Sequence, residues 1–115
     1  MEIVGIGTDL VEVARIKAFA EKQNALERIF SEEEIAYCRA RKNCYQHLAV
    51  RFAAKEAVYK ALPFDGFAFK DIQVANLENG RPQVRVNDKR MDGLAVQISL
   101  SHTDEYACAM VVVQR

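Results

Sequence analysis

Apolar positions recur with two different periods along the chain, and these periods predict where strands and helices lie. Residues 3–13 alternate with a period of two, which predicts a strand. Its two faces differ. One is apolar, with Val4, Ile6 and Leu10, and the other carries two glycines and a carboxylate, Gly5, Gly7 and Asp9. Because glycine in a strand marks close approach by a ligand or another backbone, we expect open space beside Asp9.

Helical periods follow the strand. Residues 14–29 are predicted to form a helix that ends near Phe30. Ser31 and Glu34 have the spacing of a capping box, so a second helix is expected to start there and to run to about Arg41.

The most informative segment is a long helix predicted for residues 45–62, between Asn43 and the helix-ending Pro63 and Gly66. At about 100° per residue, its small residues share one face: Val50, Ala54, Ala57 and Ala61. Larger apolar residues form a second arc: Leu48, Phe52 and Tyr59. Charges flank this arc, with Arg51 and Lys55 on one side and Glu56 and Lys60 on the other. A helix that is apolar all round is usually buried, and buried charges must be paired or face a ligand, so this helix indicates a site.

The second half of the chain has strand patterns. Residues 72–77 and 84–86 flank the turn signal Asn79-Gly80, which predicts a hairpin, and residues 88–94 are expected to form a short helix or loop. Two further strands, at 96–102 and 106–113, form a second expected hairpin. The predicted fold class is α+β in a single domain of residues 1–115: an N-terminal strand, a helical block with one long buried helix, then antiparallel strands.

Composition narrows the function classes. The net charge is zero, which argues against a general nucleic-acid binder and a polybasic membrane binder. The three cysteines, an odd number without CxxC spacing, fit reduced thiols better than a disulfide framework. The N-terminus lacks a basic n-region and no apolar run reaches membrane length, so we expect a cytoplasmic protein. A chain of 115 residues leaves much surface unburied, so oligomerisation would stabilise it.

Two carboxylates on different elements, Asp9 and Glu56, are the strongest chemical signal. Singly, Asp9 fits a strand-end carboxylate in water, and Glu56 fits a surface pair with Lys60 at i,i+4. Together, with Arg51, Lys55 and Lys60 nearby, they match what a hard divalent cation and a phosphate group require.

Two other regions have both a structural and a functional interpretation. His102 ends a strand and precedes Thr103, so it is either a capping or structural histidine at a hairpin turn or, with the neighbouring hydroxyls and turn amides, a donor to a phosphate. In the segment 15–28, basic residues surround one aromatic side chain, which indicates either a solvated amphipathic face or a dock for an acidic protein. Its members are Arg15, Phe19, Lys22 and Arg28.

Four motifs together resemble a known family, and they span nearly the whole chain in the family's order. They are Gly5-Ile-Gly-Thr-Asp9-Leu-Val-Glu-Val-Ala-Arg-Ile16, Arg51-Phe-Ala-Ala-Lys-Glu56-Ala-Val-Tyr-Lys60-Ala-Leu62, Asn79-Gly-Arg-Pro82 and Ser99-Leu-Ser-His-Thr103. The family is holo-(acyl-carrier-protein) synthase, the short bacterial class of the 4′-phosphopantetheinyl transferases. The resemblance implies Mg²⁺-dependent transfer of phosphopantetheine from coenzyme A to a serine of apo acyl carrier protein, in support of fatty acid biosynthesis. It also implies release of adenosine 3′,5′-bisphosphate and a homotrimer with active sites between subunits.

The resemblance also assigns roles to residues. Asp9 and Glu56 match the metal ligands, and Lys60 matches the lysine near the diphosphate. Arg51, His102 and Thr103 match positions that hold the nucleotide end of coenzyme A, and the four residues of the segment 15–28 fall where relatives dock the carrier. For the proton acceptor, Glu56 acting through a water on the metal is preferred over Glu56 acting directly.

Two departures and two rival functions remain. Many relatives carry a glycine-rich turn where this chain has Pro63-Phe-Asp-Gly-Phe67, so backbone contacts that relatives make there cannot be assumed for this chain. The second departure is Ala25, which stands near a position that is often basic in relatives. One rival is a coenzyme A or nucleotide-binding trimer without transferase activity, and the intact Asp9, Glu56 and Lys60 argue against it. The other is a Mg²⁺-dependent diphosphate hydrolase.

Overall fold

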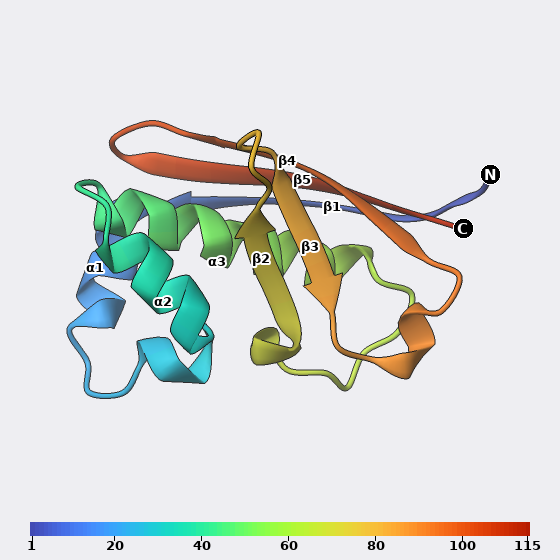
Figure 1. The fold of residues 1–115 in the computed structure, drawn as a ribbon, viewed down its shortest axis with the longest axis horizontal. Coiled ribbons are helices and arrows are strands. Elements are labelled where there is room, and N and C mark those ends of the chain that lie inside the picture. Colours follow the sequence, from blue (N-terminus) through green and yellow to red (C-terminus); the bar gives the residue numbers. More distant parts are fainter.

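A long helix packed against a three-stranded sheet forms the centre of the protein, with a small hairpin and two shorter helices around it (Figure 1). The structure is a computed structural model that describes residues 1–115. The main elements, in chain order, are β1 (Ile3–Glu12), α1 (Val13–Ala20), α2 (Glu32–Arg39), α3 (Cys44–Ala61), β2 (Ile72–Asn76), β3 (Pro82–Val86), β4 (Ala95–His102) and β5 (Tyr106–Gln114). Short 3₁₀ turns lie at Leu26–Arg28, Phe69–Asp71 and Lys89–Met91.

The strands form two antiparallel sheets. The larger has the order β1-β5-β4, so β1 and β4 are its edges, and β2 pairs only with β3. Both hairpins predicted from the sequence are present, and Gly80 has the positive φ of 85° that the first turn requires. The α+β prediction is therefore confirmed.

Gly5 and Gly7 of β1 allow α3 to pack closely against the strand. A Cβ on Gly5 would lie 1.7 Å from the carbonyl oxygen of Ala61, and one on Gly7 would lie 2.0 Å from that of Ala57. The small-residue face of α3 thus lies directly on β1, and only glycine allows this approach. The expectation of open space beside Asp9 is wrong, because the backbone of α3 fills it. Of the two reasons for glycine in a strand, a ligand or a neighbouring backbone, the second applies here.

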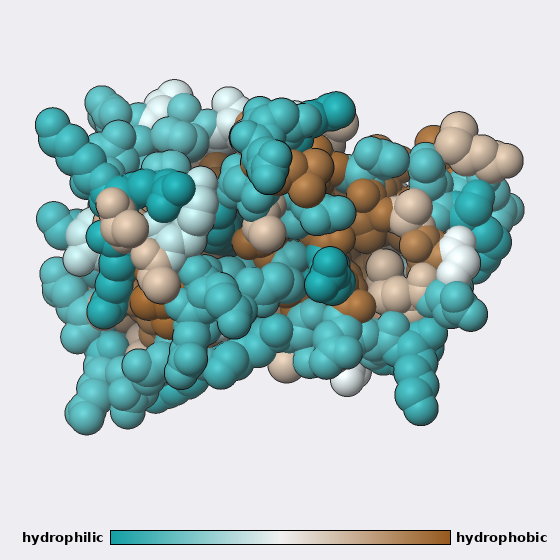
Figure 2. Space-filling model, in the orientation of Figure 1, coloured by the Kyte–Doolittle hydropathy of each residue, from teal (hydrophilic) through white to brown (hydrophobic).

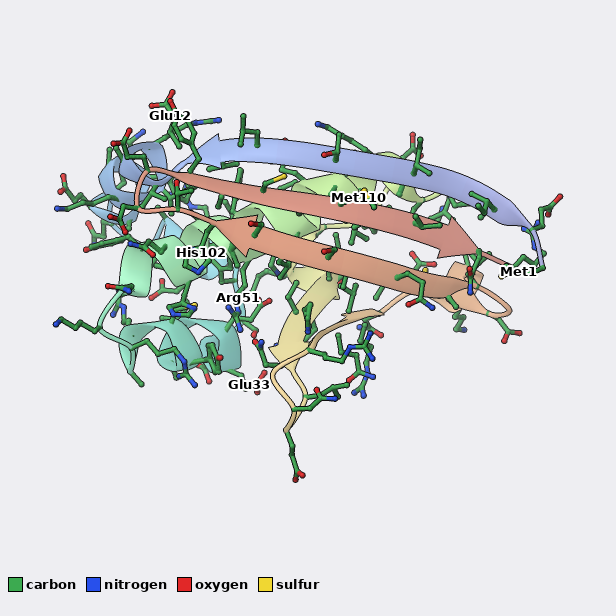
Figure 3. The ribbon with its side chains drawn as sticks, turned by 90° about the horizontal axis from the view of Figure 1, so that it is seen from above. Met1, Glu12, Glu33, Arg51, His102 and Met110 are labelled. Atoms are coloured by element: carbon green, nitrogen blue, oxygen red, sulfur yellow. The ribbon has the colours of Figure 1, made fainter.

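The other face of β1 points outward. Ile6 is 72% exposed, Leu10 is 66% exposed, and Met110 of the neighbouring strand β5 is 57% exposed. Figure 3 looks onto this sheet and labels Met110. An apolar strip on a sheet face is a candidate interface, because monomeric proteins rarely leave such surface in water.

The helix predicted for residues 14–29 is wrong in its second half. α1 ends at Ala20, and the chain turns through Asn24, whose φ of 59° is left-handed, a conformation that asparagine tolerates. The turn brings Ala25, Leu26 and then Phe30 into the core, where each is at most 5% exposed. Tertiary burial therefore overrides a helical pattern that is satisfactory locally.

The later helices follow the predictions. The Ser31 hydroxyl accepts from the Glu34 amide, and the Glu34 carboxylate accepts from the Ser31 amide, so the capping box is formed. α3 begins at Cys44 and ends at Ala61, close to the predicted bounds, and its small-residue face is buried. Figure 2 shows mostly hydrophilic surface over α1 and α2 and more apolar surface toward β3. Among these helices none combines the length and apolarity needed to span a membrane.

Candidate active site

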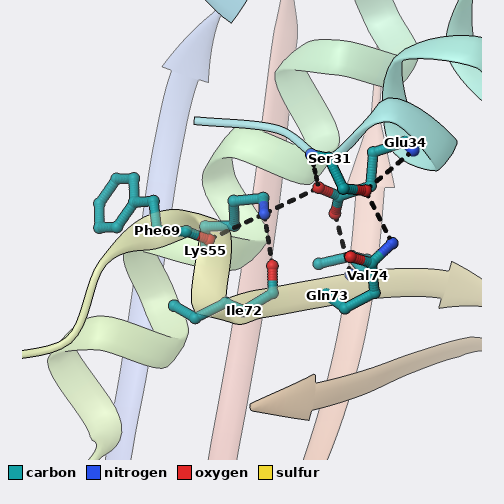
Figure 4. Close-up of polar contacts among 7 residues, drawn as sticks. All are labelled: Ser31, Glu34, Lys55, Phe69, Ile72, Gln73 and Val74. Atoms are coloured by element: carbon teal, nitrogen blue, oxygen red, sulfur yellow. Dashed lines mark hydrogen bonds and ion pairs between the residues drawn. The ribbon is translucent and has the colours of Figure 1, made fainter. Parts of the chain in front are cut away.

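The four charged side chains of α3 divide into distinct environments, and Lys55 belongs to the structural one. It is fully buried, and its Nζ lies 2.9 Å from Glu34 Oε1 and donates to the carbonyl oxygens of Phe69, at 2.9 Å, and Ile72 (Figure 4). Glu34 also accepts from the Val74 amide at 2.9 Å. The network joins α2, α3 and β2. Because the Lys55 ammonium and the Glu34 carboxylate are both paired and hydrogen-bonded, neither is left to bind a ligand.

Asp9 and Lys60 meet where β1 crosses the last turn of α3. Lys60 Nζ lies 3.3 Å from Asp9 Oδ1 and donates to the Thr8 carbonyl oxygen at 3.1 Å. The Asp9 side chain is only 15% exposed, whereas that of Lys60 is 53% exposed. The sequence offered a structural interpretation for each carboxylate, a water-facing Asp9 and a Glu56–Lys60 surface pair. Neither holds, because Asp9 is mostly buried and Lys60 pairs with Asp9 instead of Glu56.

The carboxylates of this cluster have unused capacity. Asp9 Oδ2 is buried without a hydrogen-bond partner. Glu56 is partly buried and forms no ion pair. Burial, and then the Asp9 charge, raise the pKa of Glu56. An orphaned carboxylate oxygen beside a carboxylate of raised pKa is the environment that a cation would relieve.

The donor set suits a magnesium ion that shares its coordination with a substrate. No three histidine, cysteine, aspartate or glutamate side chains in the protein cluster as a metal site. Asp9 and Glu56 therefore offer two carboxylates only. Mg²⁺ usually takes one or two carboxylates and completes its shell with waters and substrate phosphates, so these residues fit that ion.

A second group of polar and aromatic side chains surrounds Arg51. Arg51 is 3% exposed, donates from Nη2 to Asn76 Oδ1 at 2.6 Å, and lies 4.2 Å from the Tyr37 ring centroid. It forms no ion pair with a carboxylate, and its Nε has no hydrogen-bond partner. A buried guanidinium without a counter-charge is costly, so an anionic ligand is the natural complement.

The Arg51 side chain lines a pocket of about 180 Å³ that also contains His47, Asn76 and His102. The two imidazole rings are 6.0 Å apart, and no carboxylate lines this pocket. Thr103 lies just beyond it on the hairpin turn. Its Oγ1 accepts from the amides of Glu105 and Tyr106 at 3.2 and 3.0 Å, so it stabilises the turn.

The two clusters lie at opposite edges of the sheet. Asp9 is on β1, His102 is at the end of β4, and β5 separates them. Two strand spacings amount to about 10 Å, and α3 stands between the clusters on the inner face. In Figure 3, Arg51 and His102 lie together on the β4 side. The chain therefore brings Asp9 and Lys60 together beside Glu56, and Arg51 together with His102, but does not merge the two sets.

The residues predicted to dock a carrier share no single helix. Arg15 and Phe19 lie on α1, Lys22 follows its end, and Arg28 is on a 3₁₀ turn. The three basic side chains are exposed, and Phe19 is partly buried against the core. The Arg15 charge acts on Glu56 and lowers its pKa, so α1 lies within electrostatic reach of the carboxylate cluster.

Sequence reasoning missed Tyr37, His47 and Asn76 in the pocket and Glu34 as the partner of Lys55. Asn76 and Tyr37 come from β2 and α2, which no short-range pattern connects with Arg51. For His47 there was a signal, since it stands four residues before Arg51 and so shares its side of α3.

Comparison with known proteins gives consistent matches over almost the entire chain. The family model described as the 4′-phosphopantetheinyl transferase superfamily matches residues 5–111. A holo-(acyl-carrier-protein) synthase of Geobacter sp. (strain M21) is 42% identical, covering 98% of this chain and 99% of its own. Two crystal structures of such synthases are also similar. The one from Bacillus anthracis str. Ames, in complex with CoA (3′,5′-ADP), has 36% identity, a TM-score of 0.85 and coverage of 98% and 97%. The one from Neisseria meningitidis has 30% identity, a TM-score of 0.88 and coverage of 98% and 99%.

Proposed function

Since the chain belongs to the holo-(acyl-carrier-protein) synthase family of the 4′-phosphopantetheinyl transferase superfamily, we propose that it transfers 4′-phosphopantetheine from coenzyme A to apo acyl carrier protein. The acceptor is a serine hydroxyl of the carrier, and the leaving group is adenosine 3′,5′-bisphosphate. The bond that breaks joins the diphosphate bridging oxygen to the phosphorus of the pantetheine arm. We further propose that the reaction depends on Mg²⁺, takes place in the cytoplasm and supplies carrier for fatty acid biosynthesis.

One observation carries this proposal: Asp9 Oδ2 is buried without a partner while Oδ1 is paired with Lys60. A purely structural aspartate would have both oxygens satisfied. The free oxygen, Glu56 and the Lys60 ammonium together present two negative and one positive group, which matches a metal-bridged diphosphate. Mg²⁺ bound by Asp9 and Glu56 would supply positive charge against the charge that develops on the diphosphate oxygens.

The protein groups have separable tasks in this mechanism. Lys60 has an exposed ammonium held by Asp9 and Thr8, so it is positioned to contact a phosphate oxygen from the open side. Preorganised positive charge of this kind stabilises the transition state more than the ground state. Much of the remaining rate comes from aligning the serine with the scissile bond.

Glu56 is the group that accepts the serine proton. Its carboxylate is partly buried and forms no ion pair, so it is available as a proton acceptor. We prefer the route through one water, with direct transfer to Glu56 as the alternative.

Arg51 and His102 hold the nucleotide end of coenzyme A, with Thr103 at the rim of the same region. The buried and unpaired Arg51 guanidinium supports this assignment, because a phosphomonoester would supply the missing counter-charge. Thr103 can still donate its hydroxyl proton while its oxygen accepts from the turn amides.

We propose that the active site forms between subunits of a homotrimer. The two clusters at opposite edges of the sheet, with α3 between them, support this: if the β1 edge of one subunit adjoined the β4 edge of the next, one coenzyme A could contact both clusters without crossing the helix. Head-to-tail contacts of this kind close into rings. The outward Ile6, Leu10 and Met110 supply apolar surface for such an interface.

We place the carrier on the basic segment that includes Arg15, Lys22 and Arg28, with Phe19 as a partly exposed apolar contact. The electrostatic link between Arg15 and Glu56 supports this location, since the carrier serine must reach the carboxylate cluster. Reversing the charge at Arg15 or Lys22 is expected to weaken carrier binding. Carrier affinity that did not respond to either reversal would exclude docking there.

Mass spectrometry of an apo carrier incubated with the protein, coenzyme A and Mg²⁺ tests the function. The carrier should gain one phosphopantetheine group, and a Glu56→Gln variant should lose this activity while the matched surface control Glu78→Gln keeps it. Nucleotide release from coenzyme A without any carrier would instead indicate a diphosphate hydrolase. Coenzyme A binding without any mass gain would indicate a binding protein that lacks catalysis.

A further inference from the structure

The pocket around Arg51 contains a second imidazole that no motif assigned to it. His47 lies in the first turns of α3 and His102 at the end of β4, and their ring centroids are 6.0 Å apart. Both line the same pocket of about 180 Å³ as Arg51. His47 is partly buried, so it belongs to the wall of the pocket more than to the outer surface.

The ionisable groups that act on His47 are all basic side chains. Burial lowers the pKa of His47 first, and the neighbouring Arg51, His102 and Arg41 lower it further. From α2, the Tyr37 ring meets His47 edge-on at 6.1 Å, and the Arg41 guanidinium stacks on that ring at 3.3 Å. On the β4–β5 side, Asp104 is engaged by the Gln46 amide and is not among the groups that act on His47. The empty pocket therefore favours the neutral imidazole.

A phosphomonoester would reverse this balance. Its two negative charges would lie among Arg51, His47 and His102, where burial strengthens charge interactions relative to water. A neutral imidazole offers one N–H donor, and an imidazolium offers two. The protonated form of His47 is thus favoured only when the anion is present.

We propose that His47 is a specificity-determining residue of this pocket, which takes up one proton from solvent when a terminal phosphomonoester binds and then donates to it as the imidazolium. For the identity of the ligand, the 3′-phosphate of coenzyme A, this inference rests on the proposed function. No covalent bond other than N–H forms. The consequence is discrimination between coenzyme A and dephospho-coenzyme A, which lacks that phosphate.

The sign of the pH dependence follows from proton uptake. The second pKa of a free phosphomonoester is about 6, so the ligand is almost entirely a dianion only above about pH 7. Between about pH 7 and pH 8.5 the ligand charge is nearly constant while His47 must gain a proton on binding. Affinity for coenzyme A is therefore expected to fall as the pH rises through this window, whereas affinity for dephospho-coenzyme A should change little.

Imidazole proton NMR is the direct test, because the chain contains only two histidines. His47→Gln and His102→Gln variants assign the two resonances, and each is titrated with pH in the absence and presence of adenosine 3′,5′-bisphosphate and of inorganic phosphate. We expect either anion to raise the pKa of His47. A pKa of His47 that is the same with and without both anions overturns the inference, even if the enzyme is fully active.

Calorimetric titration adds the specificity readout. We expect His47→Gln to reduce the preference for coenzyme A over dephospho-coenzyme A several-fold at pH 6.5 and little at pH 8.5. A His47→Lys variant, with a permanent charge, should keep the preference but lose its pH dependence. An unchanged pH profile in both variants contradicts the proposal. If the proposed transferase function is wrong, no phosphopantetheine is transferred to any carrier. The NMR titration of His47 with inorganic phosphate tests the His47 proposal independently of that result.

Discussion

Lys55 and Glu56 are neighbours in the sequence and lie on the same helix, yet they belong to opposite kinds of charged cluster. Lys55 is fully buried, and Glu34 and two carbonyl oxygens satisfy its ammonium. Glu56 is partly buried and unpaired, beside an aspartate with one orphaned oxygen. The first cluster is complete within the chain, and the second is complete only with a ligand.

The difference shows that burial of a charge is a poor guide to function by itself. Lys55 is more deeply buried than Glu56, and its pKa is lowered by burial, although Glu34 opposes that shift. What distinguishes the candidate site is hydrogen-bonding capacity that the protein leaves unused. The same criterion identifies Arg51, whose Nε is buried without a partner.

The largest expected effect comes from breaking the complete cluster. Lys55→Met leaves the Glu34 carboxylate buried without its counter-charge, which typically costs about 3–5 kcal/mol. The double variant Lys55→Met, Glu34→Gln should recover part of that loss, because glutamine carries no charge and its amide oxygen can still accept one of the two backbone hydrogen bonds that Glu34 accepts. Urea unfolding at a fixed protein concentration measures both. A single variant as stable as the parent would mean that the pair is unimportant for the fold.

Glu56→Gln tests the incomplete cluster and should act on rate instead of stability. Loss of one preorganised charged group at the reacting centre is expected to lower turnover by about 10²–10³-fold. Because burial and Asp9 raise the pKa of Glu56, removing its charge should not destabilise the protein. Turnover and the melting temperature of the same samples give the two readouts. If the melting temperature of Glu56→Gln fell as far as that of Lys55→Met, the distinction between a structural and a functional cluster would be wrong.

Gly7→Ala tests whether close packing of α3 on β1 keeps Asp9 beside Lys60. A Cβ there would meet the Ala57 carbonyl oxygen at 2.0 Å, so the helix must shift. Overpacking typically costs about 1–3 kcal/mol, and turnover should fall with it. Gly66→Ala is the control, because nothing lies within 4 Å of its Cβ. That control has only backbone strain, so it should keep full turnover.

The smallest effect is stabilisation by the metal. If Asp9 and Glu56 bind Mg²⁺, a concentration ten times the dissociation constant should add about 1.4 kcal/mol to the stability. Thermal unfolding with Mg²⁺ and after chelation measures this in the parent and in Asp9→Asn. The variant should show no gain. Equal gains in both proteins would place metal binding elsewhere.

Much of the fold was predictable because its signals are local. Period-two alternation located β1 and β4, and a nearly continuous apolar run located β5. The Asn79-Gly80 turn located the β2–β3 hairpin, and Ser31 with Glu34 located the start of α2. The exception is the segment 14–29, where the helix ends at Ala20 and a turn through Asn24 brings Leu26 into the core. Core contacts decide such breaks, and a local pattern does not contain them.

The candidate site was predictable only in part. Motifs named Asp9, Arg51, Glu56, Lys60 and His102, but they did not tell which charges the protein already satisfies. That information lies in contacts between distant residues, such as Asp9 with Lys60, 51 positions apart, and Glu34 with Val74, 40 apart. His47 and Asn76 entered the pocket for the same reason.

The sequence alone thus determined most element types, the family and the chemical identity of the candidate site residues, because these depend on residue type and spacing. The tertiary structure decided that Lys55 is structural, that the glycines of β1 serve helix packing, and that the two candidate clusters lie at opposite edges of the sheet. The physical reason is that partner satisfaction and close packing are properties of atoms brought together by folding, and the linear order of residues does not specify them.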